Sequence, residues 1–339
     1  MRAAVLEQFG AGLVVQEVAD PSPAPDEVVV RTGAAGMCRT DLKVIDGVVK
    51  TVELPLIPGH ELAGEVVALG TGVTSATEGD QVVVGLDISC GSCHYCLIGE
   101  LDHCAALRRL GMEVDGALAE YVRVPADNLL PRPGNIDVGV AATIGDAVGS
   151  PYHAVVHHAQ VRPAQVVAVY GLGGLGLTAV QVARLCGASV IAIARSPKRR
   201  QLAEELGAYA TIDPRDAPVS EQIRELTGGL GVHAFFDVVG IEGSVEQAVL
   251  SCRKGGRVVV VGYAVTQVVA PMVQLVYDEV SVVGSRGSTR RELREVVDLV
   301  AAGRIDPIVG ERLSLDGVNG ALTRLRDGDT IGRPVVGFD

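Results

Sequence analysis

Residues 166–183 read VVAVYGLGGLGLTAVQVA, and this stretch decides the fold of the second half of the chain. A short strand-like run leads into a glycine-rich turn, and a helical pattern follows it. The glycines of the turn are Gly171, Gly173, Gly174 and Gly176. The first permits a tight turn, the second lets the backbone approach a pyrophosphate, and the last allows the helix to pack closely. Since the free N–H groups at a helix start attract phosphates, the stretch predicts a dinucleotide-binding βαβ unit.

Alternating strand and helix patterns continue on both sides of this turn. The strand-like runs are 189–194, 234–240, 257–262 and 281–285, and the helix-like runs are 150–161, 198–207, 244–255 and 288–305. Alternation at this spacing indicates a doubly wound parallel sheet. Before residue 147, Val-rich runs alternate with Gly, Pro and Asp, which indicates an irregular, mostly β domain. We therefore predict an α/β protein with a dinucleotide-binding domain over 148–282 and a mostly β domain over 1–147.

Length and charge narrow the possible functions. The 339 residues exceed what one core usually holds, and the net charge of −12 does not suit a nucleic-acid partner. The N-terminus lacks the apolar segment of a signal peptide, and the most apolar long window, 258–277, is interrupted by Gly262 and Pro271. We therefore expect a cytoplasmic protein that binds neither nucleic acid nor a membrane.

The end of the second strand of the βαβ unit bears on the choice of dinucleotide. An NAD-binding site usually has an Asp or Glu there, which binds the 2′-hydroxyl of the adenosine ribose. This chain instead has Ala194, followed by Arg195, Ser196 and the basic pair Lys198 and Arg199. Arginine beside the ribose is the usual means of binding a 2′-phosphate. The sequence therefore favours NADP(H) over NAD(H), the alternative being a solvated basic helix start.

Four of the seven cysteines lie in one short segment, CGSCHYCLIGELDHC, at Cys90, Cys93, Cys96 and Cys104. A reducing compartment disfavours disulfides, a redox pair needs only two thiols, and the spacing does not match that of a bacterial ferredoxin. Four thiolates complete the tetrahedral shell of a zinc ion and leave no position for a substrate. The segment therefore predicts a structural zinc site, with four reduced structural cysteines as the alternative.

A catalytic metal would need ligands from elsewhere in the chain. The candidates are Cys38, His60 with Glu61, and Asp146. Taken singly, each has a structural explanation: Cys38 as a small buried residue, His60 as a core histidine, and Asp146 as a helix cap. Their residue types alone do not decide between the two interpretations.

Six segments together resemble the zinc-dependent medium-chain alcohol dehydrogenases over nearly the whole length. They are GMCRTDL (36–42), PGHELAGEV (58–66), GDQVVV (79–84), the four-cysteine segment (90–104), GDAVGSPYHAV (145–155) and GLGGLG (171–176). The resemblance implies a GroES-like catalytic domain over 1–147 and 283–339 with a zinc lobe at about 88–106, a Rossmann domain over 148–282, and an active-site cleft between them. It also implies a homo-oligomer, a dimer or homotetramer, joined through sheet edges such as 257–262 or 281–285.

The same resemblance implies the residues of the active site. Cys38, His60 and Asp146 would hold a catalytic zinc, which with the structural zinc gives two per subunit. Asp146 stands where many members have cysteine, as in some bacterial secondary-alcohol dehydrogenases. Glu61 would lie beside the metal, and Asp41 would orient His60.

Further residues are implied for proton transfer and cofactor binding. Thr40 would bind the substrate oxygen and pass on its proton, and Lys43 stands where many members continue the relay with histidine. Either Lys43 or water would therefore serve in the last step. Arg39 and Arg333 match positions that contact the cofactor pyrophosphate.

The sequence thus predicts a zinc-dependent oxidoreductase that transfers hydride between NADP(H) and an alcohol or ketone, with a secondary alcohol as the expected substrate. A polyol dehydrogenase of the same superfamily is the first alternative, and apolar residues such as Val49, Ile57 and Leu110 argue against it. A zinc-free quinone or enone reductase and a zinc-ribbon interaction module are further alternatives, against which the metal ligands and the Rossmann unit count.

Overall fold

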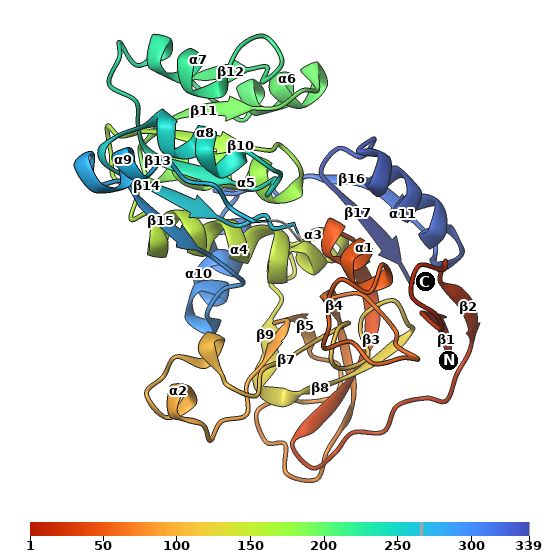
Figure 1. Cartoon of the computed structure of the whole chain (residues 1–339). Coiled ribbons are helices and arrows are strands. Elements are labelled where there is room, and N and C mark those ends of the chain that lie inside the picture. Colours follow the sequence, from red (N-terminus) through yellow and green to blue (C-terminus); the bar gives the residue numbers. More distant parts are fainter. Residues whose placement is uncertain (265–266, 339) are drawn as a thin grey trace. The chain divides into compact units, whose positions relative to one another are not determined.

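A computed structural model describes residues 1–264 and 267–338, and the chain forms two compact units. Unit 1 comprises 1–149, 287–303 and 307–339, and unit 2 comprises 150–286 and 304–306. The sequence patterns place these boundaries a few residues earlier, at 147/148 and 282/283. Figure 1 shows the elements in chain order.

Unit 2 is built on a six-stranded sheet in which every neighbouring pair of strands is parallel. Its strands are β10 (Val166–Tyr170), β11 (Ser189–Ile193), β12 (Ala210–Ile212), β13 (Val232–Asp237), β14 (Cys252–Val260) and β15 (Ser281–Gly284). The spatial order β12-β11-β10-β13-β14-β15 reverses direction beside β10. This is the strand order of a Rossmann fold, and in such folds ligands bind at the carboxyl ends of the strands, where the order reverses.

The helices of unit 2 precede or connect these strands (Figure 1). They are α4 (Gly149–Tyr152), whose first residue belongs to unit 1, the π-helix η4 (His153–His158), α5 (Gly174–Leu185), α6 (Pro197–Glu205), α7 (Val219–Leu226), α8 (Ser244–Ser251) and α9 (Met272–Tyr277). The predicted helix over 244–255 is wrong at its end, because Cys252 already opens β14 and pairs with Val232. Buried apolar side chains such as Phe235 and Ile191 fill the core on the sheet.

Unit 1 is mostly β. Its strands are β1 (Arg2–Val5), β2 (Val14–Glu17), β3 (Glu27–Gly36), β4 (Glu61–Leu69), β5 (Gln81–Val84), β6 (Asp87–Ile88), β7 (Arg108–Arg109), β8 (Tyr121–Pro125), β9 (Leu129–Pro131), β16 (Val309–Leu313) and β17 (Arg333–Gly337). The main sheet runs β16-β17-β3-β4-β5-β9, with β8 also paired to β3. Because β17 pairs with β3, the C-terminal tail completes the sheet that the N-terminal residues begin.

Short helices cover parts of unit 1. They are α1 (Arg39–Ile45), α2 (His94–Leu97), η1 (Leu101–His103), η2 (Ala126–Asn128), α3 (Val138–Thr143), the π-helix η3 (Ile144–Val148), α10 (Arg290–Ala301), η5 (Leu315–Gly317) and α11 (Val318–Asp327). A capping box begins α10, in which the Thr289 hydroxyl accepts from the Glu292 N–H at 3.2 Å. Sequence reasoning missed α11, although its buried residues Val318, Ala321, Leu322 and Leu325 have helical spacing.

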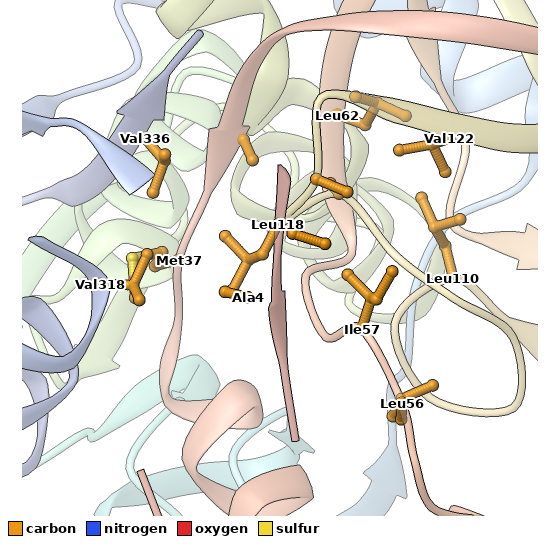
Figure 2. Packing of buried hydrophobic residues seen from close by; sticks show 14 of the residues in the cluster. Ala4, Met37, Leu56, Ile57, Leu62, Leu110, Leu118, Val122, Val318 and Val336 are labelled. Atoms are coloured by element: carbon orange, nitrogen blue, oxygen red, sulfur yellow. The ribbon is translucent and has the colours of Figure 1, made fainter. Parts of the chain in front are cut away.

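The core of unit 1 joins residues that are far apart in the sequence. Figure 2 shows Met37 beside Val318, and Leu62, Leu110 and Leu118 in the same cluster. All five side chains are buried. Leu110, one of the apolar residues used above to argue about the substrate, is therefore a core residue: it is fully buried in the core of unit 1.

No helix in residues 1–264 and 267–338 is both long enough and apolar enough to cross a membrane.

Candidate metal and cofactor sites

His60 is the centre of a buried polar cluster in unit 1. It precedes β4 and is 2% exposed. Its Nδ1 lies 3.1 Å from Oδ1 of Asp41, and its Nε2 lies 3.1 Å from Sγ of Cys38 and 3.6 Å from Oδ2 of Asp146. A histidine that donates Nδ1–H to a carboxylate leaves the lone pair of Nε2 for a metal. His60 therefore has the orientation of a metal ligand, facing a thiol and a carboxylate.

Local structure fixes the partners of His60. Cys38 follows β3 and caps α1, where its Sγ accepts from the Thr40 N–H at 3.2 Å. Asp41 is fully buried, and its second oxygen accepts from the Cys38 N–H at 2.8 Å. Asp146 lies in the π-helix η3, a helix type that recurs at functional sites. The backbone thus holds a thiol and two carboxylates around one imidazole.

The thiol and the two carboxylates around His60 favour a bound cation. Burial opposes protonation of His60, but Cys38, Asp41 and Asp146 together raise its pKa well above the ordinary value. The donor set of sulfur, nitrogen and oxygen is one that zinc accepts, and three ligands leave one coordination position open. The residues present therefore fit a zinc ion, which Cys38, His60 and Asp146 would hold: His60 shares one group of closely spaced ligand atoms with Cys38 and another with Asp146.

Glu61 and Arg333 extend the cluster. Arg333, the first residue of β17, is 5% exposed. Its Nε donates to Oε1 of Glu61 at 2.8 Å, and its Nη2 donates to Oδ2 of Asp146 at 2.8 Å. Burial raises the pKa of Glu61 to about 7, although Arg333 opposes this shift. The other oxygen of Glu61, Oε2, is buried without a hydrogen-bond partner, so that it remains available as a ligand.

The sequence indicated a different partner for Arg333, the cofactor pyrophosphate, and that contact stays a prediction. In the structure its guanidinium forms ion pairs with two carboxylates of the cluster, those of Glu61 and Asp146. Sequence reasoning also missed Gly36. A Cβ at this position would lie 1.8 Å from Oε2 of Glu61, so a glycine is needed there to make room for the carboxylate.

Helix α1 carries the residues implied for proton transfer. Thr40 and Lys43 are both half-buried and three positions apart, so they lie on one face of the helix. Burial lowers the pKa of Lys43, which makes its ammonium a better proton donor. Arg39, at the start of the same helix, is exposed.

The four-cysteine lobe has the geometry of a second metal site. The Sγ atoms of Cys90, Cys93, Cys96 and Cys104 lie within 4.8 Å of one another. Cys93 lies 3.5 Å from Cys96 and 3.9 Å from Cys104, close to the separation of about 3.8 Å that four Zn–S bonds of about 2.3 Å impose. All four are free thiols.

Backbone N–H groups point at these sulfur atoms. The Cys90 N–H donates to Sγ of Cys104 at 3.2 Å, and the Ala105 N–H donates to Sγ of Cys93 at 3.5 Å. The Ser92 N–H and hydroxyl lower the pKa of Cys90 to about 6. Donors that stabilise thiolates suit zinc, and the four sulfur atoms would fill its shell.

Unit 2 carries the glycine-rich turn between β10 and α5. Gly171 has a φ of +101°, and a Cβ on Gly176 would lie 1.7 Å from the carbonyl oxygen of Gly171. A Cβ on Gly173 would meet nothing within 4 Å, so the space beside it is open, and Gly174 begins α5. The turn therefore has the tight bend, the open approach and the close helix contact that a pyrophosphate site requires.

The loop after β11 contains Arg195 and Ser196. Arg195 is exposed, and Ser196 caps α6. Ala194, at the position of the usual ribose-binding carboxylate, is buried and apolar. The structure thus places a cationic side chain, and no carboxylate, directly after the second strand of the βαβ unit.

Known proteins resemble this chain in sequence and in fold. Residues 24–134 match the family described as alcohol dehydrogenase GroES-like domain, and residues 174–302 match the family described as zinc-binding dehydrogenase. An alcohol dehydrogenase of Geobacillus stearothermophilus is 37% identical over all of both chains. These matches confirm the predicted combination of a GroES-like domain with a Rossmann domain.

Solved structures agree. An NAD-dependent alcohol dehydrogenase is 32% identical with a TM-score of 0.93 over all of both chains. A zinc-binding dehydrogenase of Sinorhizobium meliloti 1021, bound to NADP, is 31% identical with a TM-score of 0.90 over 99% of each chain. Together with the metal-binding clusters and the glycine-rich turn, these likenesses establish the identity. The chain belongs to the zinc-dependent medium-chain alcohol dehydrogenases, enzymes that use zinc and a nicotinamide cofactor to interconvert alcohols and carbonyl compounds.

Proposed function

We propose that this enzyme oxidises secondary alcohols to ketones, and reduces ketones, with NADP(H) as its cofactor. The observation that carries the metal chemistry is the orientation of His60, whose Nε2 faces Cys38 and Asp146 while Asp41 holds Nδ1. The choice of a secondary alcohol is supported by the ligand set, since Asp146 as third ligand resembles some bacterial secondary-alcohol dehydrogenases.

The proposal includes two zinc ions per subunit with separate tasks. The four thiolates of the lobe would bind one ion and stabilise the lobe. Cys38, His60 and Asp146 would hold the other, which acts as a Lewis acid on the substrate oxygen. Arg333 pairs with both Asp146 and Glu61, which lets a partly buried and a buried carboxylate lie close together. Thr40 would hold the proton of the substrate hydroxyl, and Lys43, on the same helix face, would pass it on.

The cofactor preference is supported by the loop after β11. A free ribose 2′-hydroxyl would find the apolar Ala194 where a carboxylate is usual, whereas a 2′-phosphate would find Arg195 and Ser196. Similar structures include an NAD-dependent enzyme and one bound to NADP, so the cofactor choice rests on these residues. Gly171, Gly173, Gly174 and Gly176 suit the pyrophosphate common to both cofactors.

A substrate panel tests the proposed function. We expect kcat/KM with NADP⁺ to exceed that with NAD⁺ by about tenfold or more, because a hydrogen-bonded charge pair contributes about 1.5–3 kcal/mol. Initial rates should be measured with secondary alcohols, benzylic alcohols and polyols under both cofactors. Fastest turnover of polyols would favour the polyol dehydrogenase, and turnover limited to enones in a zinc-free preparation would favour the reductase. A preference for NAD⁺ would overturn the cofactor assignment.

We also propose a cytoplasmic homo-oligomer. The free thiols of the lobe suit a reducing compartment.

Of the two segments predicted to form the sheet edge at the subunit contact, 257–262 is wrong, because β14 pairs with β13 on one side and β15 on the other and is an inner strand. In the described sheet β15 is one of the two outer strands, and exposed apolar residues lie shortly before it in the sequence. These are Val268, Val269, Met272, Val273, Val276 and Tyr277, each more than 60% exposed. Such a patch suits a second copy of the chain.

Charges placed in this patch are expected to dissociate the oligomer. The double variant Met272→Glu, Val276→Glu would bring charge into a desolvated contact, so the mass measured by analytical ultracentrifugation should fall to that of a monomer. Leu230→Glu is a matched control, since Leu230 is an exposed apolar residue of unit 2 outside the patch. A wild-type protein that sediments as a monomer, or a double variant of unchanged mass, would contradict the proposal.

A further inference from the structure

A buried carboxylate joins two arginines beside the proposed 2′-phosphate site. Asp213 directly follows β12 and is 8% exposed. Its Oδ2 accepts from Nη1 of Arg200 at 2.8 Å and from Nη2 of Arg215 at 2.6 Å, while its Oδ1 accepts from Nε of Arg215 at 2.9 Å. The bond to Arg215 is therefore bidentate, the geometry that fixes a guanidinium most firmly.

The same two arginines also hold the loop after β11. Nη1 of Arg200 donates to the carbonyl oxygens of Ala194 and Arg195, at 2.6 and 3.1 Å. Nη2 of Arg215 donates to the carbonyl oxygen of Arg195 at 2.9 Å. Because this loop follows the second strand of the βαβ unit, it is the place where the adenosine ribose of a dinucleotide binds. Arg215 is thus tied to the backbone of that site, although it comes from the loop after the third strand.

Asp213 itself is not available to a ribose hydroxyl. Both of its oxygens bind arginine, and Oδ1 also accepts the Arg215 N–H at 3.0 Å. The hydrogen bonds from Arg215 hold the pKa of Asp213 well below its usual range, so the carboxylate remains anionic. Two carboxylates, Asp213 and the nearby Asp216, against the guanidinium groups of Arg195, Arg200 and Arg215 still leave an excess of positive charge. The region around these arginines therefore suits an additional anion. Asp213 does not take the role of the missing ribose-binding carboxylate.

Arg215 can meet a ligand from solvent. Its contacts with Asp213 and with the Arg195 carbonyl use Nε and Nη2, and its side chain is 63% exposed. We propose that Arg215 is a second specificity-determining residue for the cofactor, which binds the 2′-phosphate together with Arg195, and that Asp213 is the residue that positions it. The inference rests on the proposed preference for NADP(H) and deepens it.

The test compares the affinities for two adenosine fragments. Adenosine 2′,5′-bisphosphate carries the 2′-phosphate and 5′-AMP lacks it, so the ratio of their Kd values, measured by calorimetry on the zinc-loaded enzyme free of nicotinamide cofactor, reports this subsite alone. We expect Arg215→Ala and Arg195→Ala each to lower the preference for the bisphosphate by about tenfold, with the Kd of 5′-AMP changed less than about twofold. Arg215→Lys should retain part of the preference, because lysine binds phosphate as a point charge.

Two further variants separate positioning from folding. Asp213→Asn keeps the size of the side chain and removes its charge, so the bidentate hold on Arg215 weakens, and the preference should fall while the Kd of 5′-AMP stays unchanged. Arg162→Ala is the control, because Arg162 is an exposed arginine of unit 2 that precedes β10 and so lies before the amino end of that strand. It should leave both Kd values unchanged.

The outcomes distinguish this inference from the proposed function. If the wild-type enzyme binds both fragments equally, the proposed NADP(H) preference is wrong. If the wild type prefers the bisphosphate and Arg215→Ala retains the full preference, only the role of Arg215 is wrong. If Asp213→Asn weakens both fragments equally, Asp213 has a structural role and does not position Arg215.

Discussion

Replacement of Asp146 by alanine is expected to lower kcat by about a thousand-fold or more, because a Lewis-acid metal contributes several kcal/mol to the stability of the transition state. The variant loses one of three proposed ligands, so its zinc content should fall from about two ions per subunit to about one. The fold should persist, because Asp146 is 15% exposed and Arg333 keeps its bond to Glu61. Activity, zinc content by atomic absorption and Tm are measured together.

Asp146 is a cleaner target than His60. Removal of His60 would leave Asp41 and Cys38 buried around a void, and an uncompensated buried charge costs several kcal/mol. His60→Ala is expected to abolish turnover too, but a lower Tm would accompany the loss. Asp146→Cys restores a ligand of the type many relatives have at this position, and it should retain the second zinc ion.

An exposed carboxylate provides the control. Asp329→Ala removes an exposed aspartate of unit 1 and should change neither activity nor zinc content. The ligand assignment would be abandoned if Asp146→Ala kept both its turnover and two zinc ions per subunit. Loss of turnover with full zinc content would instead assign Asp146 a role in substrate binding.

Local patterns made much of the fold predictable. The glycine-rich turn and the alternation of strands and helices around it depend on residues that are close in the sequence, so the sequence alone indicates the Rossmann sheet. The route of the tail was harder to foresee, because β17 pairs with β3 across some three hundred residues of chain. No local pattern contains that pairing. The end of α8 was misread for a similar reason: Cys252 reads as helical locally, but its pairing with Val232 draws it into β14.

The same distinction applies to the sites. The spacing of four cysteines within one segment indicates a metal site. Arg333, by contrast, binds Glu61 across 272 positions, so only the folded chain shows that it pairs with a carboxylate of the metal cluster. Gly36 offers no chemical group at all, and its importance follows from the carboxylate that occupies the space of a side chain. Arg215 had a weak signal, since it stands two residues after an aspartate. The contact of Arg215 with the loop after β11 is tertiary.

Replacement of Cys93 by alanine is expected to destabilise the protein before it impairs catalysis. The Sγ of Cys93 lies within 3.9 Å of those of Cys96 and Cys104, so its loss opens the shell of the lobe metal. A structural zinc ion contributes directly to folding, and we expect Tm to fall by about 10 °C. In this variant zinc should fall from about two ions per subunit to about one, while kcat of the folded fraction stays within about threefold.

Cys186→Ala is the matched control, since Cys186 is a partly buried thiol at the end of α5, outside both metal clusters. It should lose no zinc, and its Tm should stay within a few degrees of the wild-type value. The measurement separates the two metals, because each variant removes one ion but affects a different quantity: Asp146→Ala lowers turnover and leaves the fold intact, whereas Cys93→Ala lowers Tm and leaves kcat nearly unchanged. A Cys93→Ala variant with unchanged Tm and abolished turnover would reverse the assignment. The lobe would then supply the reacting metal, although four thiolates leave zinc no position for an alcohol.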